Sequence, residues 1–142
     1  MVVQLVNYGR SGDSTIATAN SAELRKFGWK AGTGNVSAAY LTGLLLAKKV
    51  KEKPEKVILD LGLQHPCPGG RIFAAAKGVA DGGIKVACAE EVFPKEERIS
   101  GKHIAAYWAK EPKRFGGYAT AGLSPDDFEK HVEGVKQKIL EG

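Results

Sequence analysis

The segment between residues 26 and 35 has the residue types and spacing that could bind an anion. Lys26, Trp29 and Lys30 lie among the glycines of Gly-Trp-Lys-Ala-Gly-Thr-Gly, and Asn35 follows as a candidate helix N-cap. At a helix N-terminus, unpaired backbone N–H groups and the helix dipole attract negative charge, so a phosphate could dock there. The alternative is that the glycines only form a turn and the lysines are solvated, which the local sequence favours.

These glycines do not form a nucleotide-binding motif. A P-loop requires Gly-Lys-Ser/Thr at its end, whereas Gly34 is followed by Asn35 and Val36. The dinucleotide fingerprint requires a third glycine where Ser37 stands. We therefore expect no cofactor at this loop.

Two further basic groups lie near expected helix ends. Gly69-Gly70-Arg71 opens a helix and could form a second phosphate cradle, although Arg71 could equally be an ordinary surface residue. Lys48 and Lys49 stand at the end of another helix, where cations complement the dipole as a structural matter. Basic residues between 95 and 114 alternate with glutamates, which is typical of a solvated face.

Catalytic and metal-binding candidates are weaker. Asp60, at the end of an expected strand, is the best of them, with Asp81, Glu90 and Glu91 as imaginable metal partners. A strand-end Asp often caps a loop instead. His65 and Cys67 supply only two ligands, whereas catalytic zinc needs three. We assign no catalytic residue and no metal ligand, and keep a metal-dependent nuclease or phosphoryl-transfer enzyme using Asp60 as the alternative function.

Composition favours a polyanionic partner. The chain has 142 residues, 43% of them hydrophobic, which suits one compact domain. Its formal net charge of +5 makes nucleic acid more plausible than an acidic small molecule. Cys67 and Cys88 have no paired spacing, which fits a reducing cytoplasm without disulfides. No signal peptide or membrane span is expected, because the apolar stretch from Val36 to Ala47 is interrupted by polar and small residues.

The elements that must position the basic loops can be placed in the first third of the chain. Residues 2–8 and 14–20 are rich in β-formers and flank a glycine-containing loop, which predicts a hairpin. Asn20 and Glu23 form a capping-box pattern for a short helix that runs to Phe27, where Gly28 can end it in a left-handed conformation. A helix over residues 36–49, apolar on most sides, is predicted to be deeply buried.

A βαβ unit is predicted next. The continuous apolar run at residues 57–61 is typical of a strand covered on both faces in a parallel sheet. A helix over residues 72–80 follows, stopped by Gly82 and Gly83, and residues 84–88 resume strand character. The crossover is expected to be right-handed.

The C-terminal part is predicted to be helical. Ile104, Tyr107 and Trp108 form a candidate buried stripe. Ser124 followed by Pro125 is an N-cap and first-turn pattern. The helix that it opens has an apolar face formed by Phe128, Val132, Val135 and Ile139.

Several segments, taken as a set, resemble the archaeal ribosomal protein L-eighteen family. They include Glu-Leu-Arg-Lys-Phe-Gly-Trp-Lys at residues 23–30, Thr-Gly-Asn at 33–35 and Leu-Asp-Leu-Gly-Leu at 59–63. Gly-Arg-Ile-Phe-Ala-Ala at 70–75 and Glu-Glu-Val-Phe-Pro at 90–94 continue the likeness in the same order. The likeness runs over nearly the whole chain.

The resemblance implies a fold and a function. The fold is a three-layer α/β domain with a mixed sheet of ribonuclease-H-like topology, in which residues 1–94 form an RNA-binding core and 95–142 a helical extension packed on it. The implied function is a structural subunit that binds 5S ribosomal RNA in the central protuberance, near 23S ribosomal RNA and ribosomal protein L-five, without catalysis, cofactor or membrane. Members usually carry a basic N-terminal arm and a further strand before the segment that opens here, and a longer linker around residues 110–114.

With the cations and glycine-rich loops above, this resemblance gives a set of expected RNA contacts. The set is Arg10, Lys26, Trp29, Lys30, Thr33, Asn35, Lys48, Lys49, Arg71 and Lys77. A third hypothesis is that the chain is a protein–protein adaptor that binds its partner through Trp29, Tyr107 and Trp108.

Overall fold

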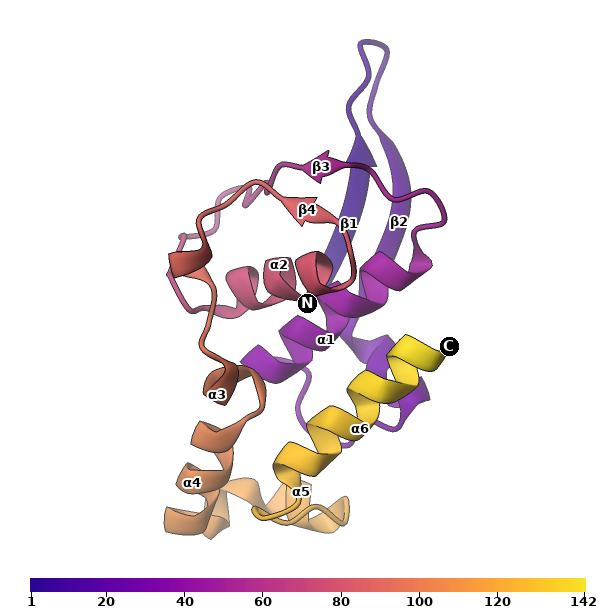
Figure 1. Ribbon diagram of the computed structural model, residues 1–142. Helices are drawn as coiled ribbons and strands as arrows, with labels where there is room; N and C mark the ends of the chain where they lie inside the picture. The colour runs from indigo at the N-terminus through magenta and orange to yellow at the C-terminus, as the bar shows by residue number, and fades with distance from the viewer.

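The computed structural model describes residues 1–142 as a mixed α/β protein (Figure 1). Its elements, in chain order, are β1 (Val2–Asn7), β2 (Ser14–Asn20), the 3₁₀ helix η1 (Ser21–Phe27), α1 (Val36–Lys49), β3 (Lys56–Val57), α2 (Arg71–Asp81), β4 (Lys85–Val86), η2 (Glu90–Val92), α3 (Glu96–Ile99), α4 (Lys102–Lys110), η3 (Pro112–Phe115), α5 (Gly116–Thr120) and α6 (Phe128–Glu141). None of these helices combines the length and hydropathy that a membrane span requires.

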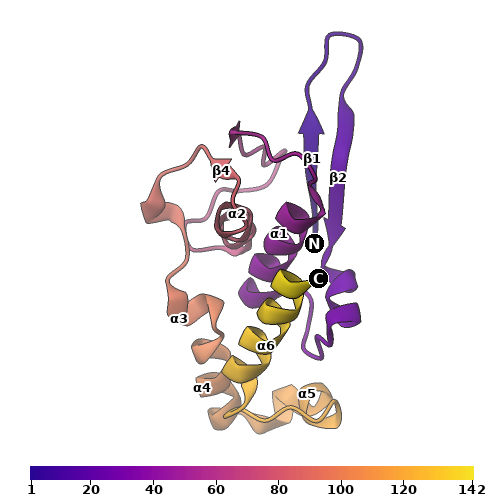
Figure 2. The same cartoon turned by 45° about the vertical axis from the view of Figure 1, so that its right-hand side comes forward.

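The N-terminal hairpin and its cap follow the sequence prediction. Strands β1 and β2 pair antiparallel, with Val2 opposite Asn20, and the hairpin projects away from the helices (Figures 1 and 2). Asn20 and Glu23 form the predicted capping box at the start of η1. Gly28 ends η1 at φ 91°, a conformation that an L side chain rarely adopts.

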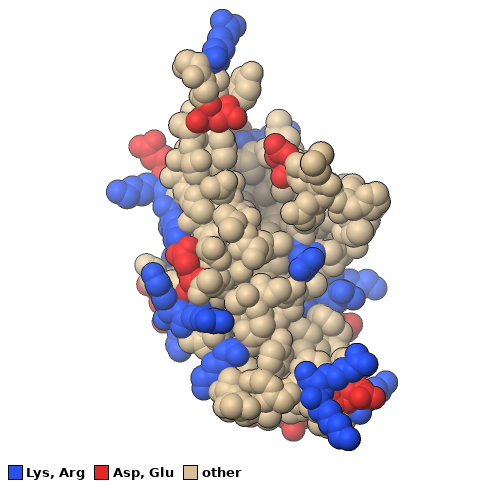
Figure 3. All heavy atoms as spheres, turned by 180° about the vertical axis from the view of Figure 1, so that it is seen from behind, with Lys and Arg blue, Asp and Glu red and all other residues tan.

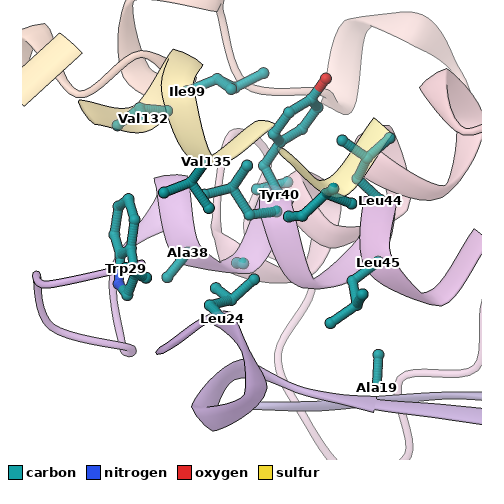
Figure 4. Close-up of a cluster of buried hydrophobic side chains, with 14 of the residues drawn as sticks. Ala19, Leu24, Trp29, Ala38, Tyr40, Leu44, Leu45, Ile99, Val132 and Val135 are labelled. Atoms are coloured by element: carbon teal, nitrogen blue, oxygen red, sulfur yellow. The ribbon is translucent and has the colours of Figure 1, made fainter. Parts of the chain in front are cut away.

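Helix α1 lies at the centre of the core, as its apolar sequence predicts. Its residues from Val36 to Ala47 are buried, because the helix contacts the hairpin, η1, α2 and α6. Figure 4 shows Val132 and Val135 of α6 on one side of α1, and Leu24 of η1 with Ala19 of β2 on the opposite side. The buried side chains of these elements form one continuous cluster.

Two glycines bring α1 and α2 into backbone contact. A Cβ atom added at Gly43 would lie 1.9 Å from the carbonyl oxygen of Ala75, and one added at Gly78 would lie 2.0 Å from that of Tyr40. Any side chain at either position would therefore push the helices apart. This close packing fixes where the N-terminus of α2 lies relative to α1.

The prediction of a five-residue buried strand at residues 57–61 is wrong in length and burial. Only Lys56 and Val57 pair, parallel to Lys85 and Val86 of β4, and Ile58 is 86% exposed. The structure has two separate two-stranded sheets, β1–β2 and β3–β4. A strand is buried on both faces only where other elements cover both faces, and the exposed Ile58 shows that this segment is not covered in that way.

The C-terminal helix is confirmed, with a later start than predicted. Phe128, Val132, Val135 and Ile139 of α6 are all buried, as their spacing predicts. Ser124 Oγ accepts a hydrogen bond from the Asp127 backbone N–H at 3.3 Å, as an N-cap does, but the regular helix begins only at Phe128 and Asp127 occupies its cap position. In the predicted stripe of α4, Trp108 is buried, whereas Tyr107 is 42% exposed.

Candidate nucleic-acid interface

The loop between η1 and α1, residues 28–35, is held in shape by its own backbone and by Trp29. The Trp29 backbone N–H donates to the carbonyl of Leu24 at 3.0 Å. Its indole Nε1–H donates to the carbonyl of Gly32 at 3.2 Å. The loop is therefore folded around a tryptophan that is only 3% exposed.

Asn35 ends this loop and begins α1. Its Oδ1 accepts from the Ala38 backbone N–H at 2.7 Å, and its Nδ2 donates to the carbonyl of Gly32 at 2.9 Å. The predicted N-cap is confirmed. Because both polar atoms of the side chain have partners within the protein, its role in the structure is to shape the loop.

Arg71 joins the two glycine-containing helix starts. It is the first residue of α2, and its Nη1 donates to the carbonyl of Gly34 at 3.2 Å. Arg71 and Lys30 are both exposed. The loop before α1 and the loop before α2 therefore lie side by side, and each presents a cation to solvent.

His131 of α6 supports the same loop. Its imidazole Nε2 accepts a hydrogen bond from the Lys30 backbone N–H at 3.1 Å. The phenolic oxygen of Tyr118 also lies against the loop, 2.8 Å from where a Cβ of Gly32 would be. Neither residue was predicted to contact this loop, because no local pattern links it to residues so far away in the sequence.

Two of the expected contacts, Lys49 and Lys77, are ion-paired. Lys49 Nζ binds the Glu23 carboxylate at 2.6 Å and the Thr18 carbonyl at 2.9 Å, so it ties the hairpin and η1 to α1. The hydrogen bond from Lys49 is the main reason that the pKa of Glu23 is lowered, followed by the bond from the Asn20 backbone. Lys77 is half-buried and pairs with Asp81 at 3.0 Å.

The remaining expected contacts divide into groups by position. Lys30 and Arg71 are exposed and Thr33 is half-buried, and all three lie near the two helix starts. Lys26 is also exposed but lies on η1. Lys48 lies at the far end of α1, which is about 21 Å long at 1.5 Å per residue.

Arg10 lies in the turn of the hairpin, far along the chain from the other cations. Figure 3 shows one basic side chain at the tip of the hairpin, where Arg10 is the only Lys or Arg among residues 1–20. The same view shows basic side chains along the flank of the molecule and at its lower end. The cations thus form several groups rather than one patch.

The two tryptophans are buried, which argues against the hypothesis of a protein–protein adaptor. Trp29 is 3% and Trp108 is 4% exposed, so neither offers an accessible ring to a protein partner. The Trp29 ring stacks on His131 with centroids 5.1 Å apart and meets Phe128 edge-on at 6.2 Å. Both tryptophans serve as core residues, since their rings already have aromatic partners.

The acidic residues do not assemble a metal site. Asp60 Oδ1 accepts from the Gly62 backbone N–H at 2.8 Å, so it caps a loop. Asp81 is engaged by the hydroxyl of Tyr40 at 2.8 Å as well as by Lys77. No group of three or more His, Cys, Asp or Glu side chains is placed to hold a metal ion.

Comparisons with known proteins agree with one another. A model of the family described as "Ribosomal large subunit proteins 60S L5, and 50S L18" matches residues 1–55. The large ribosomal subunit protein uL18 of Desulfurococcus amylolyticus is 51% identical, over 98% of this chain and 75% of that protein. The uL18 proteins of Caldivirga maquilingensis and Methanothermobacter thermautotrophicus are 44% and 42% identical, each over 99% of this chain and over 73% and 77% of their own lengths.

Fold and surface together define a small basic α/β protein that presents cations at two adjoining helix starts. The chain belongs to the uL18 family of large ribosomal subunit proteins. This membership confirms the resemblance to archaeal family members and the expectation that the chain is not an enzyme. The alternative of a nuclease using Asp60 has no support in the structure or in the comparisons.

Proposed function

We propose that the chain is a structural component of the large ribosomal subunit that binds 5S ribosomal RNA through the surface formed by residues 28–35 and the start of α2. The observation that carries this proposal is the hydrogen bond from Arg71 to the Gly34 carbonyl. It brings the N-termini of α1 and α2 together, and helix N-termini with nearby cations favour phosphate oxygens. Lys30, Thr33 and Arg71 are the contacts that this surface offers, and Lys26 on η1 is a further exposed cation.

More distant cations extend the proposed interface. Arg10 at the hairpin tip and Lys48 at the end of α1 are exposed, so both can reach phosphates of a folded RNA. Lys49 and Lys77 are held in ion pairs, so we assign them a structural role in this interface. Trp29 and Asn35 contribute by fixing the shape of the loop at residues 28–35. Folded RNA is recognised largely by backbone contacts and shape, which suits cations held on a rigid frame.

The proposed partners follow from the family resemblance. They are 5S ribosomal RNA, 23S ribosomal RNA and ribosomal protein L-five, in the central protuberance of the cytoplasmic ribosome. Membership of a family of large-subunit proteins supports this set. The formal net charge of the chain, +5, also supports binding to a polyanion such as RNA.

We also propose the finer architecture that the resemblance implies. The two sheets are separate in the structure, one antiparallel and one parallel. The order hairpin, helix, strand, helix, strand is nevertheless the order that a mixed sheet of ribonuclease-H-like topology in a three-layer domain requires, and this order supports the proposal. Residues 1–94 would form the RNA-binding core, and residues 95–142 a helical extension packed on it. The contacts between α6 and α1 support that packing.

A salt series on a 5S ribosomal RNA transcript tests the proposed function. Log affinity should fall linearly with log salt, because each phosphate contact releases counterions. An unrelated structured RNA of the same length serves as the control and should bind more weakly at every salt concentration. Absent or salt-insensitive binding would contradict the proposal.

A further inference from the structure

Tyr8 is the one tyrosine of the chain whose ring has no partner within the protein. The chain has four tyrosines. The other three have an aromatic or cationic partner, at 5.9, 5.8 and 5.6 Å respectively: Tyr40 with Lys136, Tyr107 with Phe115, and Tyr118 with Trp108. Tyr8 is 84% exposed, so most of its ring is in solvent.

The position of Tyr8 makes this ring accessible to a large partner. The last paired residues of the hairpin are Asn7 and Ser14, so residues 8–13 form its tip. The hairpin projects away from the helices, as Figure 2 shows from a second side. Packing within the protein therefore does not account for an aromatic ring at the tip.

Hydrogen bonds within the tip define its shape. The Gly12 N–H donates to the Gly9 carbonyl at 3.1 Å, which closes a four-residue turn. The Gly9 N–H donates to Oδ1 of Asp13 at 3.5 Å, so this carboxylate has a partner inside the turn. A Cβ atom at Gly9 would lie 2.7 Å from the Gly12 carbonyl oxygen, and Gly12 has a φ of 129°. A turn that is already formed loses little conformational entropy when a partner binds.

The chemistry of the tip suits a nucleotide. Tyr8 provides one exposed ring and Arg10 one exposed cation, and the other residues from 9 to 13 are glycines, a serine and an aspartate. A protein interface buries roughly 800 Å² on each partner, whereas one aromatic residue buries only about 150–250 Å². An unpaired base stacks on a single aromatic ring, and its phosphate binds a cation such as arginine.

We infer that Tyr8 stacks on an unpaired base of the ribosomal RNA that the chain binds, with Arg10 on a neighbouring phosphate. This inference rests on the proposed RNA binding and adds a residue that selects for RNA structure. Phosphate contacts position a protein without reading the bases. A stacking ring requires a base whose face is free, which a base inside a continuous helix does not offer. The hairpin tip therefore directs the chain to a loop, bulge or end of the RNA.

A salt series on a 5S ribosomal RNA transcript separates stacking from charge. Tyr8→Ala should lower the affinity about fivefold or more, because stacking on one aromatic residue contributes on that scale. The decrease should be the same at every salt concentration, since the lost ring carries no charge. Arg10→Ala should instead flatten the slope of log affinity against log salt by about 0.7 to 0.9.

Three further variants are matched controls. Tyr8→Phe keeps the ring and should bind as tightly as the parent. Tyr8→Leu keeps an apolar side chain without an aromatic face and should bind as weakly as Tyr8→Ala. Ile16→Ala removes another exposed apolar side chain of the same hairpin, 56% exposed, and should leave the affinity unchanged. Far-ultraviolet circular dichroism of each variant verifies folding.

Chemical probing of the RNA locates the stacked nucleotide. A reagent that acylates flexible 2′-hydroxyl groups should find one unpaired nucleotide of the transcript protected by the parent and by Tyr8→Phe. The same nucleotide should remain reactive in the complex with Tyr8→Ala, while the other protected nucleotides stay protected.

The possible failures are distinguishable. A parent that does not bind the transcript would overturn the proposed function and this inference together. A parent that binds, with Tyr8→Ala binding equally well, would overturn the inference alone. Full affinity of Tyr8→Leu would show that an apolar contact is sufficient and would exclude stacking. A flatter salt slope in Tyr8→Ala would assign its effect to lost phosphate contacts instead.

Discussion

The Lys30 backbone N–H donates to Nε2 of His131 at 3.1 Å, although the two residues are 101 positions apart. The imidazole also stacks on the Trp29 ring, with an interplanar angle of 22°. Helix α6 thus holds the loop that presents Lys30 to the proposed RNA. The acceptor role requires neutral Nε2, because a protonated imidazole has no acceptor nitrogen.

Acid should destabilise the protein partly through His131. Burial, and then the charges of Lys30 and Lys138, lower the pKa of His131 below its ordinary value of 6.5. The unfolded chain therefore binds a proton at a higher pH than the folded chain does. This contribution to stability is present above about pH 6.5 and is lost as the pH falls through the folded pKa.

Denaturant unfolding at pH 7 and pH 5 measures this effect. The parent should lose more unfolding free energy between the two pH values than His131→Gln, whose side chain does not titrate. His103, whose pKa is also lowered by burial and by Arg98, remains in both proteins and cancels in the comparison. Equal losses in the two proteins would rule out a role for His131 in the pH dependence.

Lys30→Ala and Arg71→Ala should weaken binding to 5S ribosomal RNA without unfolding the protein. Each lost phosphate contact should flatten the slope of log affinity against log salt by about 0.7 to 0.9. The unfolding free energy of Lys30→Ala should change by no more than about 0.5 kcal/mol, because the side chain is exposed. Arg71→Ala also loses the hydrogen bond to the Gly34 carbonyl and should cost about 0.5–1.5 kcal/mol.

Lys85→Ala is the matched control for these two variants, since it removes the same charge from an exposed position on β4. Its salt slope should equal that of the parent. An equal decrease in all three variants would indicate that net charge, and not the surface at the two helix starts, governs binding.

Asn35→Ala should reduce stability by about 0.5–2 kcal/mol through loss of the N-cap of α1. Asn35→Ser keeps an oxygen that can accept from the Ala38 N–H, and should retain most of the stability. Thermal unfolding of the three proteins measures this order. A loss of RNA affinity in Asn35→Ala at unchanged stability would instead show that Asn35 contacts the RNA directly.

Gly43→Ala should destabilise the protein by about 1–3 kcal/mol, because the new methyl group overlaps the Ala75 carbonyl of the adjoining helix. Gly134→Ala is the control, since Gly134 lies on α6 with open space around its Cβ position. There the exchange should stabilise the helix by about 0.5–1 kcal/mol. Chemical denaturation of both variants should therefore give opposite signs, and equal signs would contradict the close contact between α1 and α2.

Local signals in the sequence were sufficient for most of the elements. The capping box of Asn20 and Glu23, the left-handed Gly28 and the N-cap Asn35 are all found where their patterns predict, because each depends on hydrogen bonds within a few residues. The apolar spacing of α6 also predicted its buried face. Prediction was poorest at residues 57–61, since a strand needs hydrogen-bond partners that are distant in sequence.

By itself, the sequence determined the family, the helices and their caps, and the residue types from which a phosphate-binding surface could be made. Only the tertiary structure decided which of those residues face solvent and which lie together. It joined Arg71 to Gly34, placed His131 against Lys30 and buried Trp29. These outcomes depend on the packing of α1 against α2 and α6, so they result from contacts between segments far apart in the chain rather than from any local pattern.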